Sequence, residues 1–309
     1  MDCVQAAASG PIERLIVLTD TLNHIASLRR TTLFLVCAFA LLFSSARADE
    51  PSKAGVPEVK QEDAEAVPKF DFAAAAAGYE ISIGKDRLIC EPSQIELLKW
   101  SNPVRGSPAG TVFLWHHKGA PQAACCMFAY RNPEVKGDFL VNHEFVSLST
   151  DLIESKSNEG LVWKTTMPGI AWQEVPESPP IAKTRSARLV QMRDLASKFT
   201  GQIGKANNVR EELRLLRQPI YRYPETSDRD GAIFVFAQTT DPEILLLLQT
   251  DPLATGSQWS CAFARMTMFP CWLSHREKEV WSVPSLNPKV DSDTYRTFRR
   301  VPWKAVEEK

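Results

Sequence analysis

The stretch GAIFVFAQTTDPEILLLLQT, residues 231–250, places two apolar runs on either side of Thr239, Thr240, Asp241 and Pro242. Each run is apolar at both odd and even positions, which is typical of a strand in a sheet that is covered on both faces. Proline fixes its own φ and disfavours a helical residue before it, and aspartate is common in turns. The stretch therefore predicts a hairpin of two buried strands joined by a turn at residues 239–242.

The same pattern occurs earlier in the chain. Residues 110–130 read GTVFLWHHKGAPQAACCMFAY, with Gly110 in the place of Gly231 and Pro121 in the place of Pro242. The separation between glycine and proline is 11 residues in each copy, and the apolar positions between them agree. The turn residues differ, so the shared residues indicate a common architecture rather than a common chemistry.

Matches on both sides extend the repeat. Phe145 and Trp163 are 18 residues apart, as are Phe263 and Trp281, and SNPVR upstream of the first copy resembles RQPIYR upstream of the second. The offset between the copies is 121 residues in the hairpin and 118 for the Phe–Trp pairs, which one change in loop length reconciles. A period this long exceeds that of a solenoid repeat. It predicts a duplicated half-domain.

The clearest helical pattern follows a breaker cluster, PESPPI, at residues 176–181. Apolar residues recur there at helical spacing, with Ser186 as the expected N-cap: Leu189, Met192, Ala196, Phe199 and Ile203. We therefore expect an amphipathic helix over residues 186–203. The alanines at residues 73–77 predict a shorter helix that ends at Gly78, and strand patterns recur at residues 212–215, 259–268 and 280–283.

These patterns predict an α+β fold that is predominantly antiparallel β. Two tandem similar β-meander halves, within residues 70–175 and 205–309, are expected to be joined by a linker and amphipathic helix at residues 176–204.

Residues 1–48 have the features of a secretory signal peptide. Arg29 and Arg30 precede an apolar run at residues 33–43, and the small-x-small tripeptide Ala46-Arg47-Ala48 follows it. The run is shorter than the about 20 residues that a membrane span needs. We expect cleavage after Ala48, a secreted or periplasmic mature protein, and no membrane span after cleavage. Acidic residues are unusual in such a leader, so we also expect translation to start near Leu28, with residues 1–27 preceding the true start.

The composition and charge of the chain limit the classes of partner that we expect. The 309 residues are 44% hydrophobic and 24% charged, which suits one large or two small folded domains. Residues 49–69, rich in acidic residues and proline, are expected to form a flexible linker. Without residues 1–48 the net charge is −2 and no basic stripe appears, so we expect no nucleic-acid partner.

Five cysteines follow the leader: Cys90, Cys125, Cys126, Cys261 and Cys271. An odd number outside the cytoplasm allows at most two internal disulfides, whose pairing the sequence leaves open. The apolar neighbours favour small buried side chains. No CxxC or CxxCH motif occurs, which excludes the usual redox and haem-attachment motifs.

Imidazole and carboxylate groups that could bind zinc gather in the first half. His116, His117, His143 and Glu144 fall near the ends of neighbouring predicted strands. Successive residues of a strand point to opposite faces, so only one member of each adjacent pair can converge. Two ligands remain where three are needed, and we expect no metal site. A site at His117, His143 and Glu144 is the alternative.

Other reactive residues lack the partners that catalysis requires. Ser107 lies outside a Gly-x-Ser-x-Gly elbow, and Cys126 lies in an apolar predicted strand, which favours an inert thiol. No phosphate-binding loop, dinucleotide-binding motif or calcium-binding loop occurs. We therefore expect no catalytic residue and no cofactor.

Three further groups are expected to be structural. The acidic residues at positions 241–243 and 291–293 suit solvated turns. Arg222 and Arg265 have aromatic and apolar neighbours, and buried arginines must be paired, so internal salt bridges are expected. Eight tryptophans could form a sugar-stacking platform, but Trp163 and Trp281 repeat between the halves, which favours core packing.

Four short motifs, QP-x-YRY, DGA-x-F, TDPE and W-x-x-A-x-ARMT, lie within LRLLRQPIYRYPETSDRDGAIFVFAQTTDPEILLLLQT and WSCAFARMT. Through these motifs the chain resembles a family of secreted planctomycete proteins with no assigned activity. WSNPVRGSPAGTVFLW and HEFVSLS precede them, so the resemblance spans residues 97–283. It implies export and the same fold, but no chemistry.

We therefore expect a non-catalytic extracytoplasmic binding or scaffold module of the cell envelope, whose partner is an envelope protein or polysaccharide. The alternative is a metal-dependent hydrolase with its site at His117, His143 and Glu144.

Overall fold

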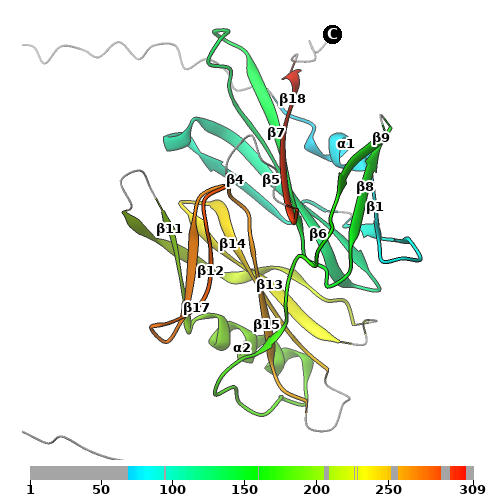
Figure 1. Cartoon of the computed structure of the whole chain (residues 1–309). Coiled ribbons are helices and arrows are strands. Elements are labelled where there is room, and N and C mark those ends of the chain that lie inside the picture. The colour runs from blue at the N-terminus through cyan, green and yellow to red at the C-terminus, as the bar shows by residue number, and fades with distance from the viewer. Residues whose placement is uncertain are drawn as a thin grey trace, which may run out of the picture. The chain divides into compact units, whose positions relative to one another are not determined.

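The computed structural model describes residues 69–93, 95–158, 160–204, 209–225, 227, 229–251, 257–286 and 293–303. They all belong to one compact unit, Gln61–Lys309. Antiparallel strands make up most of this unit (Figure 1), which confirms the prediction of a predominantly antiparallel β protein. No helix in the described ranges is long and apolar enough to cross a membrane. The predicted signal peptide, and the predicted linker up to residue 68, lie outside the described residues.

The elements fall into two series. The first contains α1 (Phe72–Ala77), β1 (Tyr79–Ile83), β2 (Leu88–Ile89), β3 (Glu91–Pro92), β4 (Leu98–Asn102), the 3-10 helix η1 (Pro103–Arg105), β5 (Ser107–His117), β6 (Ala120–Arg131), β7 (Phe139–Ser147), β8 (Ile153–Ser157), β9 (Gly160–Lys164) and β10 (Gln173–Glu174). The second contains α2 (Arg185–Ala196), β11 (Phe199–Gly204), β12 (Arg210–Arg222), β13 (Asp230–Gln238), β14 (Asp241–Thr250), β15 (Ser260–Arg265), β16 (Cys271–His275), β17 (Lys278–Val283) and β18 (Tyr295–Trp303). We call α1 to β9 the N-terminal half and α2 to β17 the C-terminal half.

The strands form three sheets. One has the order β2-β1-β8-β9, the second has the order β18-β7-β6-β5-β3 with β4 also paired to β5, and the third has the order β10-β15-β14-β13-β12-β11-β16-β17. In the C-terminal half, the long strand β12 pairs with both β11 and β13. In the N-terminal half, three short strands take its place: β2 pairs with β1, and β3 and β4 pair with β5. The neighbour order is therefore the same in both halves.

The opening hairpin is covered on both faces, as its sequence predicted. Phe234 and Leu246 on one face of β13 and β14 are buried in a core that includes Met192 of α2. Ile233 and Leu245 on the other face are buried in a second core. The cause is the period of two in a strand, which sends successive apolar side chains to opposite faces.

The second core joins the two halves. It contains Val112 and Leu114 of β5 together with Val235 of β13 and Leu247 of β14, all at most 1% exposed. In the N-terminal half, the opposite face of β5 and β6 buries Phe113 in a third core with α1. A sheet from each half is thus packed against a helix on one side and against the other half on the other.

The two central hairpins have the same register. β5–β6 pairs Phe113 with Cys125, and β13–β14 pairs Phe234 with Leu246, each 121 residues later. The register shifts at the equivalent place in both hairpins, between Trp115 and His116 in β5 and between Phe236 and Ala237 in β13. The first turn residue has a positive φ in both, 48° at Lys118 and 57° at Thr239.

The outer hairpins agree as well. β8–β9 shifts register after Ser155, and β16–β17 shifts 118 residues later, after Leu273. The predicted Phe–Trp pairs are both in contact, with ring centroids 6.0 Å apart for Phe145 and Trp163 and also 6.0 Å apart for their counterparts. The offsets of 121 and 118 residues between matching sequence positions are therefore also the offsets between matching strand pairs.

The glycine at the start of each central hairpin lies under an aromatic ring, which comes from β4 in one case and from the residue after β12 in the other. Gly110 pairs with Trp100, and a Cβ at Gly110 would collide with the indole. The Tyr223 amide donates to the Gly231 carbonyl, and a Cβ at Gly231 would lie 2.7 Å from Tyr223 Cζ. The repeated glycine is thus explained by close packing. The equivalent of Trp100 is Tyr223, so the upstream similarity of SNPVR to RQPIYR does not mark equivalent positions.

The outermost strands cross between the halves. β10 follows the N-terminal half in the chain but pairs with β15 of the C-terminal half. β18 follows the C-terminal half but pairs with β7 of the N-terminal half. Each half therefore receives an edge strand from the segment that follows the other half.

The predicted helix over residues 186–203 was too long. α2 ends at Ala196, and its N-cap is Thr184, whose hydroxyl accepts from the Ala187 amide, rather than Ser186. Phe199 and Ile203 belong to β11, which pairs with β12 and β16. Their spacing of four residues satisfies a strand as well as a helix, because both have the same parity.

We expect Gly110→Ala and Gly231→Ala each to lower the free energy of unfolding by about 1–3 kcal/mol, because overpacking against the aromatic ring forces a shift of ring or strand. Urea denaturation measures the effect. Gly78→Ala is the control, since Gly78 has an ordinary φ of −76° and a Cβ there meets nothing closer than 3.4 Å. Wild-type stability of both strand variants would contradict this explanation of the repeated glycine.

Candidate functional site

Two acidic residues at the start of β14 lie at the centre of the candidate site. Asp241 and Glu243 are two residues apart in one strand, so their side chains point to the same face. Glu243 is 1% exposed and the Asp241 side chain is 13% exposed. The expectation of a solvated turn was therefore wrong for this pair, because the turn ends at Thr240 and both acids already belong to the strand.

The N-terminal half covers these acids because the hairpin turn docks on β4. The Thr240 hydroxyl accepts from the Ser101 amide at 3.2 Å and donates to the Ser101 carbonyl at 2.9 Å. The next residue, Asn102, donates its side-chain amide to Asp241 Oδ2 at 3.1 Å. The turn is thus a docking point between the halves as well as a connection.

Arg105 supplies the cation of the site. Its Nη1 donates to Glu243 Oε1 at 2.6 Å and to Asp241 Oδ2 at 3.3 Å. The short helix η1 fixes its position, since the Asn102 side chain accepts from the Arg105 amide at 3.3 Å and Gly106 closes the turn with a φ of 73°. One guanidinium therefore serves two buried carboxylates.

A third carboxylate, Glu144 of β7, lies in the same region and is 9% exposed. Asn142 Nδ2 donates to Glu144 Oε1 at 3.3 Å and to the hydroxyl of Thr297 in β18 at 2.9 Å. Tyr295, also in β18, is buried beside Glu144, and burial, followed by the charge of Glu144 and a hydrogen bond to it, raises the pKa of Tyr295. The crossing strand β18 thus forms part of the wall.

These groups line a cleft of about 550 Å³, which we call the acidic cleft. Arg105, Asn142, Glu144, Asp241, Glu243 and Thr297 line it together with Ser107 and Thr267. Its apolar wall consists of Phe128, Tyr130, Met266, Met268 and Phe269. Its volume is in the range of small-molecule sites.

The three acids are buried, and the single guanidinium beside them does not offset the effect of burial on their pKa values. Desolvation raises the pKa of Glu243 to about 8 and that of Asp241 to about 6, although Arg105 lowers both. Burial, followed by the charge of Asp241, raises the pKa of Glu144 well above its ordinary value. Three acids share one guanidinium, so the cleft retains protons near neutral pH.

The residues of the predicted alternative metal site are not brought together. His143 Nδ1 is 2.7 Å from the Tyr79 hydroxyl, on the face of β7 that packs toward α1. Glu144 follows it in the strand and lies on the acidic-cleft side, while His117 is the half-buried last residue of β5. Among the described residues, no group of three or more His, Cys, Asp or Glu side chains is arranged to hold a metal ion.

The five cysteines are buried and unbridged in the structure. Burial raises the pKa of Cys261 to about 11 and those of Cys90 and Cys271 to about 12, and raises the pKa of Cys125 and Cys126 as well. Cys126 faces the core between the halves, whereas Cys125 faces the α1 core. A protonated thiol is a poor nucleophile, so these side chains behave as small apolar residues.

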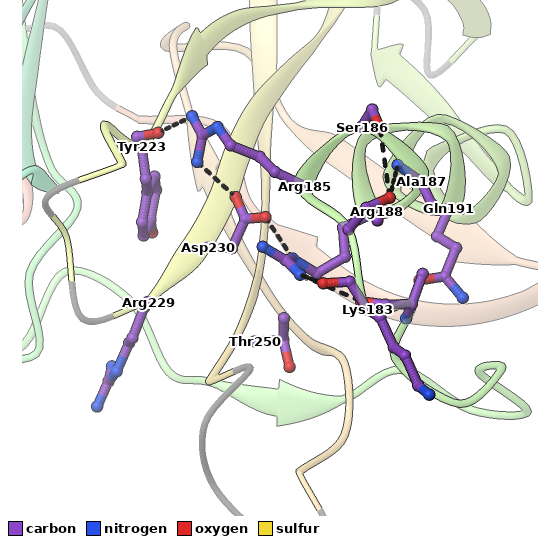
Figure 2. A network of polar contacts seen from close by, with 12 residues as sticks. Lys183, Arg185, Ser186, Ala187, Arg188, Gln191, Tyr223, Arg229, Asp230 and Thr250 are labelled. Carbon is purple, nitrogen blue, oxygen red and sulfur yellow. Dashed lines mark hydrogen bonds and ion pairs between the residues drawn. The ribbon is translucent and has the colours of Figure 1, made fainter.

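A contrasting charge cluster surrounds Asp230, which is 2% exposed. Arg188 and Arg222 bind its carboxylate at 2.6–2.8 Å, and Arg185 approaches it at 3.3 Å. Figure 2 shows Arg185 and Arg188 of α2 directed at Asp230, with Arg185 also reaching the Tyr223 carbonyl. The guanidiniums outweigh the effect of burial and lower the pKa of Asp230. This confirms the predicted internal salt bridge of Arg222.

Arg265 differs from its prediction. Its Nε and Nη2 donate to the carbonyls of Thr267, Phe269 and Pro284 at 2.7–2.9 Å, so backbone oxygens rather than a carboxylate satisfy it. Of the two acids predicted to lie in a solvated turn at positions 291–293, Asp291 lies outside the described residues, and Asp293 accepts from the Thr166 and Met167 amides at 2.6 and 2.7 Å. Both groups are structural.

The tryptophan side chains that the structure describes do not form a common platform. Trp100, Trp115, Trp163 and Trp259 are at most 6% exposed and belong to cores. A larger cleft of about 780 Å³ is lined by Glu91, Lys118 and Arg222 among others, but Glu91 and Lys118 are exposed and Arg222 is engaged by Asp230. Of these two clefts, the acidic cleft is therefore the one lined by buried ionisable side chains that a ligand could contact.

The chain matches no protein-family model, no curated protein and no solved structure. The site therefore rests on its own geometry. Sequence patterns missed Arg105 and the convergence of Glu144 with Asp241 and Glu243, because β4, β7 and β14 are far apart in the chain. The spacing of Asp241 and Glu243 at alternate strand positions was the one available signal.

Glu243 should make stability depend on pH. The folded protein keeps a proton on this carboxyl up to about pH 8, whereas the unfolded glutamate loses it near its ordinary pKa of 4.5. The stabilising contribution is therefore complete below that ordinary pKa and is lost as pH rises through the raised one. Glu243→Gln removes this titration. As pH rises, the free energy of unfolding of Glu243→Gln should therefore increase relative to that of the wild type, by at most about 1.4 kcal/mol per pH unit.

Urea denaturation at about pH 5 and about pH 8 measures this difference. The control is Glu154→Gln, because surface lysine and arginine neighbours lower the pKa of Glu154 and its titration falls below this range. A difference between wild type and Glu243→Gln that stays constant over the range would contradict the retained proton.

Proposed function

We propose that this protein is a non-catalytic binding module of the cell envelope, acts outside the cytoplasm, and holds part of its partner in the acidic cleft. The partner is an envelope protein or polysaccharide. The observation that carries the proposal is a cleft of about 550 Å³ that combines three buried carboxylates with an apolar and aromatic wall. Concave sites with a few converging polar groups are the usual place for ligands.

The proposed architecture is an α+β fold made by duplication of a β-meander unit, with each unit beginning in a helix. The equal strand orders, the equal register shifts and the equal Phe–Trp contacts of the two halves support it. The helix α2 packs on β13 and β14, as α1 packs on the sheets of the N-terminal half. On this view α2 begins the second copy and also connects it to the first.

Binding is favoured over metal-dependent hydrolysis by the placement of the candidate ligands. His143 is engaged with Tyr79 on one face of β7, and Glu144 lies toward the other. The Asp241 and Glu243 carboxylates bind the Arg105 guanidinium rather than a histidine. A guanidinium can orient a ligand, but its ordinary charge state makes it unable to act as a base at neutral pH.

Location outside the cytoplasm follows from the proposed leader. We expect a bacterial host that expresses the whole chain to release a mature protein that starts at Asp49, because Ala46-Arg47-Ala48 is a small-x-small cleavage site. Intact mass and N-terminal sequencing identify the start. Ala48→Phe should block cleavage and retain the leader; a wild-type protein recovered from the cytoplasm with its leader intact would contradict export.

The cleft itself can be tested by filling it. We expect the methyl signals of Met266 and Met268, both on the cleft wall, to shift in nuclear magnetic resonance spectra when a library of small cationic, neutral and anionic compounds is screened. Thr297→Trp should abolish these shifts because Thr297 lines the cleft. Thr200→Trp is the matched control, since Thr200 is an exposed residue in a strand of the other half.

If no compound of any charge shifts these methyl signals in the folded wild-type protein, the proposed binding function is wrong. Shifts that persist in Thr297→Trp would place the ligand somewhere else on the molecule.

A further inference from the structure

We infer that the acidic cleft recognises a ligand cation, a primary ammonium or a guanidinium carried by a small molecule or by a peptide side chain. The inference rests on the proposed binding function and names the class of ligand. Three features of the cleft support it independently: its charge balance, its aromatic wall and an internal comparison between the halves.

The charge balance is the first feature. Glu144, Asp241 and Glu243 supply three carboxylates to a buried surface that contains one guanidinium. Arg105 is bound by Asp241 and Glu243, while Glu144 interacts with the neutral amide of Asn142 and the neutral hydroxyl of Tyr295. A second cation near Glu144 would complete the neutralisation that Arg105 begins, and opposite charge is what makes a buried carboxylate tolerable.

The wall of the cleft suits a cation as well. The Arg105 guanidinium lies over the Phe269 ring, 5.1 Å from its centroid. The Phe128 and Tyr130 rings also line the cleft and lie 6.1 Å apart. Aromatic faces attract ammonium and guanidinium groups, and carboxylates with aromatic rings form the usual surroundings of a bound cation. Arg105 shows within the protein itself how such a group is held.

For each of the three acids, the equivalent position in the opposite half provides an internal comparison. By strand register, the equivalent of Asp241 is Ala120 and the equivalent of Glu243 is Gln122. The equivalent of Glu144, which pairs with Cys126, is Ala262, which pairs with Leu247. The same strand pairing forms with neutral residues, so the fold does not require these acids. Their cost of burial is therefore explained by what the cleft binds.

The hydroxyl of Tyr295 belongs to the same charge balance. It is 1% exposed, and burial, followed by the charge of Glu144 and a hydrogen bond to it, raises the pKa of Tyr295. Tyr295 is therefore a neutral partner of Glu144 and supplies no positive charge.

Binding of a cation should release protons. The carboxyls of Asp241 and Glu243 have pKa values of about 6 and about 8, so a cation that favours their ionised forms displaces protons near neutral pH. The charged or titratable groups that face them are Arg105 of η1, Glu144 of β7, Tyr295 of β18, Cys126 of β6 and Cys271 of β16. Affinity for the cation should therefore rise between about pH 6 and about pH 8.

The experiment is calorimetric titration of the purified whole protein with butylamine, with butylguanidine and with a lysine-containing tripeptide. Butanol is the uncharged control of similar shape. We expect both cations to bind and butanol not to bind, and the released protons to appear as a heat that depends on the ionisation enthalpy of the buffer. If the tripeptide binds more tightly than butylamine, the source of the cation is a peptide; the reverse order indicates a free small molecule.

Two cleft variants localise the effect. Glu144→Gln and Glu243→Gln should each weaken binding of butylamine by at least about tenfold, which corresponds to about 1.4 kcal/mol. Glu154→Gln, which removes an acid outside the cleft, should leave the affinity unchanged. Thermal melting of each variant verifies folding, and Glu144→Gln provides the test if Glu243→Gln does not fold.

The outcomes separate this inference from the proposed function. If neutral or anionic compounds occupy the cleft and neither amine nor guanidine binds, the ligand class is wrong while the binding function stands. Butylamine affinity that is unchanged in Glu144→Gln and Glu243→Gln would also overturn the inference. If nothing binds in the cleft, the binding function itself fails.

Discussion

The whole structure depends on the need to cover a central sheet on both faces. The runs in β13 and β14 are apolar at every position, so neither face can be left in water. α2 covers one face and the N-terminal half covers the other. The N-terminal half has the same requirement, with Phe113 turned to α1 and Leu114 turned to the C-terminal half. Packing the halves together through these faces satisfies both at once.

Covering the two faces also creates two charge clusters, which are opposite in composition. The packing of α2 on its sheet forms the cluster at Asp230, and the docking of the two halves forms the acidic cleft. Asp230 receives three guanidiniums from Arg185, Arg188 and Arg222, and its pKa falls. Arg105 faces the acids of the acidic cleft, and their pKa values rise. In the first cluster the excess cations are 11–30% exposed and can be hydrated. In the second the excess charge is buried, and a proton or a bound cation must compensate it.

Sequence patterns predicted the local elements better than the site. The doubled apolar runs, the Gly–Pro spacing and the Phe–Trp spacing led to the strands and to their register, because these properties depend on residues close in the chain. Phe199 and Ile203 were assigned to a helix because a spacing of four suits both element types, and Gly201, over which Phe236 packs, was the stronger signal for a strand. Burial of Asp241 and Glu243 could not be predicted, since it depends on the docking of Thr240 on Ser101, 139 residues away.

The crossing of β10 and β18 has a consequence for dividing the chain. A cut between the halves would separate each sheet from the strand that closes it, and β7 and β15 would both expose unpaired backbone groups. Each fragment would carry the edge strand that the other lacks, so neither fragment would be complete without the other.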